Sequence, residues 1–296
     1  MTKADSDAGQ LRLFDLPESG PGPLTFAPIR YPIWTENKAR LIQRYLYYFV
    51  LITKHGTYID GFAGPQEPDK PETWAAKLVV ESEPRWLRNF HLCEKDKAKV
   101  QLLRELRDSQ RPPEHKEPTR KIHILDGDFN VLVGDVLNHE SLGESVAAFC
   151  LLDQRTFECD WSTLVSLAEH KSGRKIELFY FLATGWLPRA FAALQDFAIP
   201  ERWWGGQDWE KVPSMNGEER ARIFCQRFQN ELGYRHAYAF PIYGKRSGGR
   251  VMYHMIHGSD HDEAPNLMAR AYRKATGAPE PMEQLEFELA EWRATK

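Results

Sequence analysis

Four short apolar segments, each ending in an acidic residue, constrain the fold of this chain more than any other feature. They read TYID, FHLCE, KIHILDGD and AAFCLLD, at residues 57–60, 90–94, 121–128 and 147–153. Helical periodicity fills other stretches of the chain, over about 34–54, 74–80, 96–109, 129–137 and 161–171. Strands that alternate with helices predict a mostly parallel sheet with helices on both faces. We therefore expect a doubly wound α/β fold.

The C-terminal half departs from this alternation. After the apolar run IELFYFLA, the stretch PERWWGGQDWEKVP at residues 200–213 is rich in aromatic residues and glycine, and we interpret it as an inserted loop. A helix is expected over about 217–232 and another over 264–276. Between them, HAYAFPIY and RVMYHMIHG flank the glycine-rich connection GKRSGG, which is typical of a β-hairpin. This hairpin should give the sheet an antiparallel edge.

The length allows one large domain or two small ones, and we expect one. Residues 25–278 should form it, after a flexible tail at 1–24 that is rich in Gly, Pro, Ser and Asp and contains the island QLRLF. An acidic segment at 279–296 follows. The formal charge of −3 argues against coating nucleic acid through bulk charge, although local basic patches are compatible with it.

The cysteines and the hydropathy bear on the compartment. The four cysteines include no CxxC pair, which indicates neither a zinc ribbon nor a disulfide framework. No apolar run approaches the roughly 18 residues of a membrane span, and the polar N-terminus is unlike a signal peptide. We expect a cytoplasmic protein without membrane contact.

The strand-end acids predict a ligand site. Asp60, Glu94, Asp128 and Asp153 should lie along one carboxyl edge, where open α/β sheets bind ligands. The turn after the first strand reads GFAGPQ, which lacks the GxGxxG pattern of dinucleotide folds but still lets backbone approach a ligand. The alternative is an ordinary tight turn in the core.

YIDGFAGP resembles motif I of Rossmann-like S-adenosylmethionine methyltransferases. Together with CEKD, LLDQRTFECDW and WWGGQDW, it also resembles the three-Cys-motif partner proteins, known as TcmP, over roughly residues 34–268. The resemblance implies S-adenosylmethionine as cofactor and a three-Cys-motif protein as partner. The cofactor-binding residues that it implies are Asp60, Gly61, Ala63, Gly64, Glu94 and Asp128.

The same resemblance places a catalytic motif after the fourth strand. By this resemblance Asp153 and Phe157 could take the roles of the acid and the base-stacking aromatic residue of amino-methyltransferases, with Arg155 helping to orient the target. Gln154 and Arg155 stand where those enzymes carry two prolines, and Gln66 replaces a third small residue in motif I. Cys159 is an alternative nucleophile, although its acidic neighbours disfavour a thiolate.

Two further sets of residues suggest macromolecular partners. Basic residues at the hairpin could grip phosphates and tryptophans could stack on bases. These nucleic-acid candidates are Lys245, Arg246, Arg250, Trp203 and Trp204, with weaker support from Lys38, Arg40 and Arg44. The tail island resembles the pentapeptide that binds the bacterial sliding clamp, through Gln10, Leu11, Leu13 and Phe14. The alternatives are a solvated basic loop, core tryptophans and a tail that docks on its own domain.

The leading hypothesis is a methyltransferase-like protein that transfers a methyl group from S-adenosylmethionine to nucleic acid. In this hypothesis Asp153 orients the target, and catalysis comes mainly from alignment of the target with the methyl group. One alternative is a non-catalytic adaptor that keeps the fold and docks to a DNA-processing partner such as the sliding clamp. Another is a nuclease whose strand-end acids hold Mg²⁺. His254, His257 and His261 form a weak metal pattern, because strand alternation points the first two to opposite faces. No metal site is therefore predicted.

Overall fold

The computed structural model describes residues 33–34, 37–244 and 249–276. The predicted tail at 1–24 with its QLRLF island, the hairpin residues Lys245 and Arg246, and the acidic segment at 279–296 lie outside this range. Both the expected domain limits and the clamp-binding motif therefore stay predictions.

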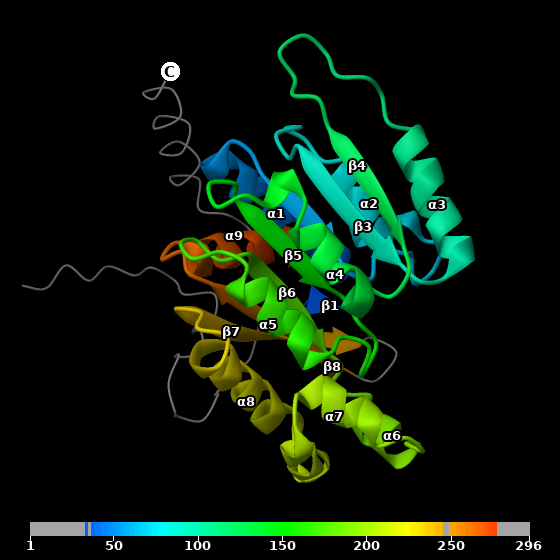
Figure 1. Ribbon diagram of the computed structural model, residues 1–296, viewed down its shortest axis with the longest axis vertical. Coiled ribbons are helices and arrows are strands. Elements are labelled where there is room, and N and C mark those ends of the chain that lie inside the picture. The colour runs from blue at the N-terminus through cyan, green and yellow to red at the C-terminus, as the bar shows by residue number, and fades with distance from the viewer. Residues whose placement is uncertain (1–32, 35–36, 245–248, 277–296) are drawn as a thin grey trace, which may run out of the picture.

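The core of the fold is a single eight-stranded sheet, in the order β1-β7-β8-β6-β5-β2-β3-β4 (Figure 1). Its strands are β1 Ile33–Trp34, β2 Thr57–Asp60, β3 Asn89–Glu94, β4 Lys121–Asp126, β5 Ala148–Leu152, β6 Glu177–Leu182, β7 His236–Gly244 and β8 Arg250–Ser259. The predicted strands are all present. The two-residue strand β1 was not anticipated from the sequence.

Strand directions confirm the predicted fold class. All pairs from β4 across to β6 are parallel, whereas β8 runs antiparallel to both of its neighbours, β6 and β7. The predicted hairpin is thus present, with β1 paired in parallel to its outer strand β7. This mostly parallel sheet with one antiparallel strand is the Rossmann-like methyltransferase architecture expected from the sequence.

Helices cover both faces of the sheet. They are α1 Lys38–Thr53, α2 Ala75–Val80, α3 Lys97–Asp108, α4 Phe129–Leu137, α5 Trp161–Glu169, α6 Leu187–Ala192, α7 Ala198–Trp204, α8 Gly217–Asn230 and α9 Ala264–Thr276. Short 3₁₀ segments are η2 Pro71–Thr73, η3 Glu140–Leu142 and η4 Gln207–Ser214. The start of α3 and the start of α8 follow from the sequence. Asp96 is the N-cap of α3 and accepts hydrogen bonds from two backbone amides, and Asn216 and Glu219 form a capping box at α8.

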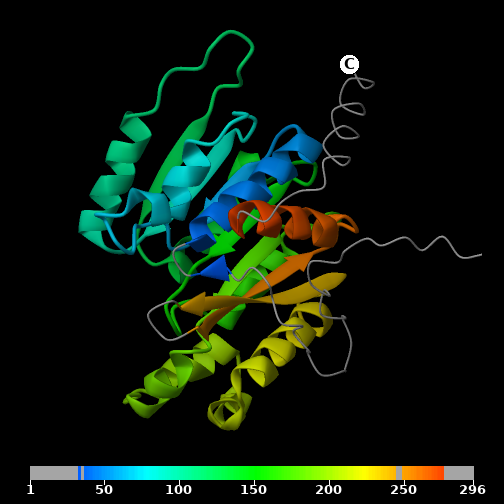
Figure 2. The same cartoon turned by 180° about the vertical axis from the view of Figure 1, so that it is seen from behind.

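Each face of the sheet has its own apolar core. Side chains of α1, α2, α3 and α9 form one core, and side chains of α4, α5, α7 and α8 form the other. Figure 1 shows α4 and α5 on the face of the sheet nearer the viewer. Figure 2 shows the opposite face, which α1 and α9 cover. The strands β2, β5 and β6 are buried along their whole length, as central strands covered on both faces should be.

The prediction that residues 200–213 form a loop is wrong. The segment folds into α7 and η4, preceded by α6. Trp203 is 0% exposed, and its Nε1 donates a hydrogen bond to the Tyr180 hydroxyl at 2.8 Å. The sequence suggested a loop because of its aromatic residues and glycines, but packing of Trp203 against β6 overrides that local preference.

Among the described residues, we find no helix long and apolar enough to cross a membrane.

Candidate functional site

The strand-end acids gather at the carboxyl edge of four neighbouring parallel strands. Asp60 and Glu94 end β2 and β3, Asp126 ends β4, and Asp153 follows β5. A cleft of about 210 Å³ lies at this edge. Predicted site residues that line it are Gly61, Gly64, Glu94, Asp128, Asp153 and Arg155. The structure therefore brings together most of the residues that the sequence singled out.

Glu94 holds the glycine turn in place. Its Oε2 accepts a hydrogen bond from the Gly64 amide at 3.1 Å, and its Oε1 accepts from the amides of Lys95 and Asp96, each at 2.9 Å. A carboxylate offers about four acceptor positions. Three of them are used by backbone, which leaves room for one bond to a ligand.

The two glycines of the turn are required by protein packing. A Cβ on Gly64 would collide with Glu94 Oε2 and come within 2.7 Å of Lys99 Cδ. A Cβ on Gly61 would lie 2.7 Å from the ring of Phe129 and 2.9 Å from Leu152. Real side chains essentially never approach so closely. The glycines thus bring β2, α3 and α4 together around the cleft.

Ala63 and Asp60 lie behind the cleft wall. Ala63 is 2% exposed, and its carbonyl oxygen accepts a hydrogen bond from Trp74 Nε1 at 2.6 Å. Asp60 is 1% exposed, and it accepts from the Tyr58 hydroxyl at 2.8 Å and the Phe62 amide at 3.1 Å. Burial raises the pKa of Asp60 to about 7, against the lowering effect of these two bonds. In the structure both residues support the turn from within, and their expected contact with a cofactor stays a prediction.

Asp128 is exposed at the cleft. It caps α4 through Oδ1, which accepts from the backbone and side-chain nitrogens of Asn130 at 2.8 and 2.9 Å. Both bonds use the same oxygen, so Oδ2 can bind a ligand. The neighbouring Asp126 instead pairs with Lys97 at 2.6 Å and Arg104 at 3.5 Å. The cleft therefore contains Asp128, whereas Asp126 belongs to an ion-pair cluster on α3.

Asp153 has partners on both oxygens. Lys38 Nζ lies 2.7 Å from Oδ1, and Gln66 Nε2 donates to Oδ2 at 3.3 Å. Lys38 is only 6% exposed, so it is not the surface cation that was weakly expected to contact nucleic acid. Gln66, which departs from the small residue of motif I, thus links the glycine turn to Asp153, the acid predicted to be catalytic.

The other two predicted catalytic residues differ in position. Arg155 is exposed at the cleft. Phe157 is half-buried, with its ring centroid 4.9 Å from that of Phe191 and 5.1 Å from that of Trp203. Its ring belongs to an aromatic cluster. Cys159 is completely buried, and burial followed by the charge of Asp160 raises the pKa of its thiol, so a thiolate nucleophile is ruled out here.

Of the predicted nucleic-acid residues Arg250, Trp203 and Trp204, which the structure describes, only Arg250 is exposed. Arg250 is exposed, whereas Trp203 and Trp204 are 0% and 9% exposed. These two rings pack on Phe224 at centroid distances of 5.4 and 5.7 Å. Their burial leaves no ring face for a base, because aromatic packing with α8 uses those faces. Stacking by this tryptophan pair is therefore excluded.

The histidines of the hairpin are separated as strand alternation predicts. His257 Nε2 lies 2.6 Å from Glu177 and faces Tyr45 of α1, whereas His254 Nδ1 lies 3.0 Å from the hydroxyl of Thr184. A different trio, His91, His123 and His139, was missed. Aligning β3 and β4 at their terminal acids, Glu94 and Asp126, pairs His91 with His123, so the signal was available.

No protein-family model matches the chain, and no curated protein matches it. Among solved structures, the chain is similar to a DUF574 family protein from Streptomyces avermitilis MA-4680, at 13% sequence identity and a TM-score of 0.40. That match covers 75% of this chain and 83% of the other. The fold assignment above depends on the sheet topology and not on this likeness.

Proposed function

We propose that the cleft at the carboxyl edge binds S-adenosylmethionine and that this chain is a methyltransferase-like protein. The observation that carries the proposal is the convergence of Gly64, Glu94, Asp128 and Asp153 from four different strand ends on one cleft. The sequence resemblance assigns these positions to the cofactor and its target. Open α/β sheets bind ligands at this edge.

The chemistry of the lining suits a cationic adenosyl ligand. Five acidic side chains and three basic ones line the cleft. Glu94 retains one acceptor position and Asp128 retains Oδ2, and carboxylates of this kind accept hydrogen bonds from ribose hydroxyls and amino groups. When bound, S-adenosylmethionine supplies a methyl group activated by a sulfonium.

Asp153 would orient the methyl acceptor in such an enzyme. Lys38 and Gln66 hold its carboxylate at the cleft, and Arg155 is exposed beside it. Alignment of the acceptor would then supply most of the catalysis. We keep nucleic acid as the proposed acceptor, supported by the resemblance of YIDGFAGP to nucleic-acid methyltransferases and by the exposed Arg250.

A specific observation favours a second candidate, a non-catalytic partner protein like TcmP. Both carboxylate oxygens of Asp153 are engaged by protein groups, and Phe157 packs within an aromatic cluster. In this case the proposed partners are a three-Cys-motif protein and, through Gln10–Phe14, a sliding clamp. The fold and the cofactor would then be retained for stability or regulation.

The nuclease alternative receives no such support. Among the described residues, the histidine trio is the one group whose donor atoms are close enough to share a metal ion. The strand-end acids are not among them: Asp60 is buried and bonded to Tyr58, and Asp153 is paired with Lys38. Mg²⁺ prefers several carboxylate and water oxygens in octahedral geometry.

Two measurements test the proposal in sequence. Isothermal titration of the full chain with S-adenosylhomocysteine should give one site per chain with micromolar affinity. If wild-type protein shows no binding, the cofactor assignment is wrong. Where binding is present, transfer of a labelled methyl group from S-adenosylmethionine to DNA or RNA distinguishes the enzyme from the non-catalytic partner, and the substitution Asp153→Asn should abolish that transfer while binding persists.

A further inference from the structure

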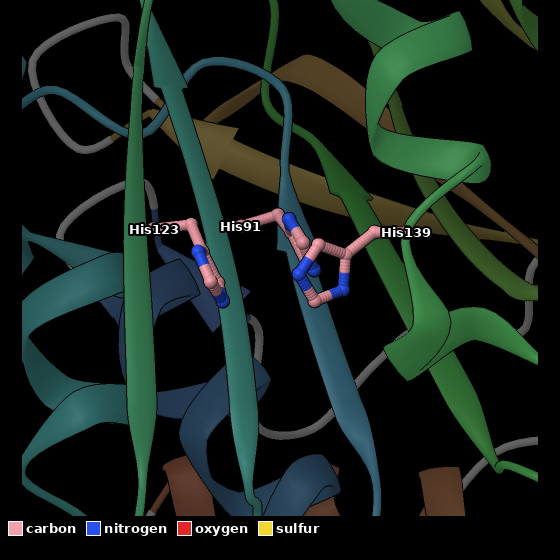
Figure 3. Close-up of side chains that lie close together, drawn as sticks. All are labelled: His91, His123 and His139. Carbon is pink, nitrogen blue, oxygen red and sulfur yellow. The ribbon is translucent and has the colours of Figure 1, made fainter.

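Three histidine side chains from separate segments meet on one face of the sheet. His91 lies on β3, His123 on β4, and His139 in the connection after α4 (Figure 3). One nitrogen of each ring can be chosen so that all three lie within 4.8 Å of one another. Figure 3 shows the His139 ring reaching across from its loop toward the two strand residues.

The positions of the first two histidines follow from strand register. His91 and His123 are direct Cα partners in the parallel ladder between β3 and β4, so their side chains project from the same face. Their rings are stacked, with centroids 4.8 Å apart and planes 13° apart. The ring of His139 is tilted against both, at centroid distances of 4.8 Å from His91 and 4.7 Å from His123.

The hydrogen bonds of this cluster are incomplete. The Ser141 hydroxyl lies 2.9 Å from both His91 Nε2 and His139 Nδ1. His123 Nε2 is buried, and in the described part of the structure it has no hydrogen-bond partner. A buried polar atom without a partner is costly and calls for an explanation. A metal ion among the rings would supply the missing partner.

The cluster is available to a cation. An imidazole binds a metal ion through a nitrogen that carries no proton. Ser141 also lines a cavity of about 490 Å³ at the amino ends of β3 and β4, together with Asn89 and Lys121. The cavity therefore reaches the cluster at Ser141, the hydrogen-bond partner of His91 and His139, and not at the rings themselves.

We infer that His91, His123 and His139 form a zinc-binding site. Zn²⁺ takes imidazole nitrogens at about 2.0–2.1 Å in tetrahedral geometry, which places the ligand nitrogens about 3.4 Å apart. Small rotations of the rings, with His139 on a connecting segment, would close the present spacing. A water molecule would be the fourth ligand, and the Ser141 hydroxyl would orient the rings through its contacts with His91 and His139.

Three imidazoles favour zinc over the hard cations Mg²⁺ and Ca²⁺, which prefer oxygen ligands. The site is separate from the cofactor cleft, because its cavity lies at the amino ends of strands whose carboxyl ends form that cleft. Zinc binding here would therefore be measurable whether or not S-adenosylmethionine binds.

The test is metal titration of the full chain after dialysis against EDTA. Isothermal titration with ZnCl₂ should give one site per chain, and Co²⁺ should produce the visible absorption bands of a tetrahedral nitrogen-ligated ion. Added Zn²⁺ should raise the melting temperature, since an ion that binds the folded state stabilises it by mass action. If wild-type protein shows neither stoichiometric binding nor cobalt bands, the trio is an ion-free ring cluster and the inference is overturned.

Two substitutions locate the site. His123→Ala should weaken zinc binding at least about a hundredfold, because even second-shell changes cost 10–100-fold in metal affinity. His115→Ala removes an exposed imidazole outside the cluster and should leave the affinity unchanged. Circular dichroism confirms that each variant is folded. Zinc binding that survives His123→Ala would place the ion elsewhere and contradict the assignment.

Discussion

Lys38 at the start of α1 forms a nearly buried ion pair with Asp153 at the end of β5, with 2.7 Å between Nζ and Oδ1. The two residues are 115 positions apart in the sequence. Their side chains are 7% and 12% exposed, and the ammonium also lies 4.9 Å from the ring centroid of Tyr253. The pair therefore joins α1, the segment that follows β5, and β8.

Replacing only Lys38 should destabilise the protein more than replacing both Lys38 and Asp153. Lys38→Met leaves a desolvated carboxylate without its cation, and we expect a loss of about 3 kcal/mol in the free energy of unfolding. The double variant Lys38→Met/Asp153→Asn should recover a large part of that loss. Urea unfolding of all four members of the cycle measures the coupling. Purely additive losses would show that the pair contributes no interaction of its own.

Asp60 should make stability depend on pH. Its folded-state pKa of about 7 exceeds its ordinary value of 3.8, so the folded protein holds a proton that the unfolded chain releases. This contribution is fully present below pH 3.8 and is lost as the pH rises through about 7. The upper bound on the loss is about 4 kcal/mol, at 1.36 kcal/mol per pKa unit.

Asp60→Asn isolates this effect, because its carbonyl can accept from the Phe62 amide while its amide group donates to the Tyr58 hydroxyl. The wild type loses this contribution as the pH rises from 4 to 8 and the variant does not, so the free energy of unfolding of the variant minus that of the wild type should be larger at pH 8 than at pH 4. Urea unfolding at both pH values gives the difference. If the two proteins differ in free energy of unfolding by the same amount at pH 4 and at pH 8, Asp60 titrates at its ordinary pKa.

Asp128→Asn should weaken S-adenosylhomocysteine binding about tenfold, which is what the loss of a hydrogen bond to a charged group is worth. Asparagine caps a helix as well as aspartate, so α4 should remain intact. Asp126→Asn is the matched control: it removes the same charge two residues away, where the carboxylate pairs with Lys97. Equal affinities for the two variants would remove Asp128 from the binding site.

Gly64→Ala should disturb the cleft and Gly134→Ala should not. The new Cβ at Gly64 collides with Glu94 and Lys99, so we expect a loss of about 1–3 kcal/mol in stability together with weaker ligand binding. Gly134 lies in α4 with nothing within 4 Å of an added Cβ, and alanine there should stabilise by about 0.5–1 kcal/mol. Thermal unfolding and isothermal titration of both variants separate the two effects.

The cysteines should be unreactive in the native protein. All four are buried, and burial raises the pKa of Cys93 and Cys225 to about 12. Reaction with Ellman's reagent should therefore follow global unfolding, with four thiols released in urea and almost none without it. A thiol that reacts rapidly in native buffer would identify an exposed cysteine and contradict this burial.

The sequence was most informative where local patterns and topology agree. Strand-end acids predicted the carboxyl edge, because parallel strands end at the same side of a sheet, and Glu94 and Asp128 lie there. The histidine trio was also accessible, since the terminal acids of β3 and β4 set the register of His91 and His123. What was lacking was the alignment of one strand with the next.

Other features depended on contacts that no local pattern reveals. Lys38 pairs with a residue 115 positions away, and its sequence environment is that of a solvated helix face. Trp203 is buried because Tyr180 and Phe224 surround it, although its glycine-rich neighbourhood suggested a loop. Asp60 ends a strand just as Glu94 does, yet its side chain faces inward to Tyr58. Only the tertiary packing distinguishes these cases.

The position of β8 affects how the protein is made. During synthesis β6 at residues 177–182 emerges long before β8 at 250–259, which is its antiparallel neighbour. Until β8 emerges from the ribosome, the free edge of β6 is an apolar template for pairing with other chains. The strands β2 to β5, whose carboxyl ends form the cleft, are by then already synthesised. A chain that stalls before residue 250 would therefore contain these strands together with an unpaired, aggregation-prone edge at β6.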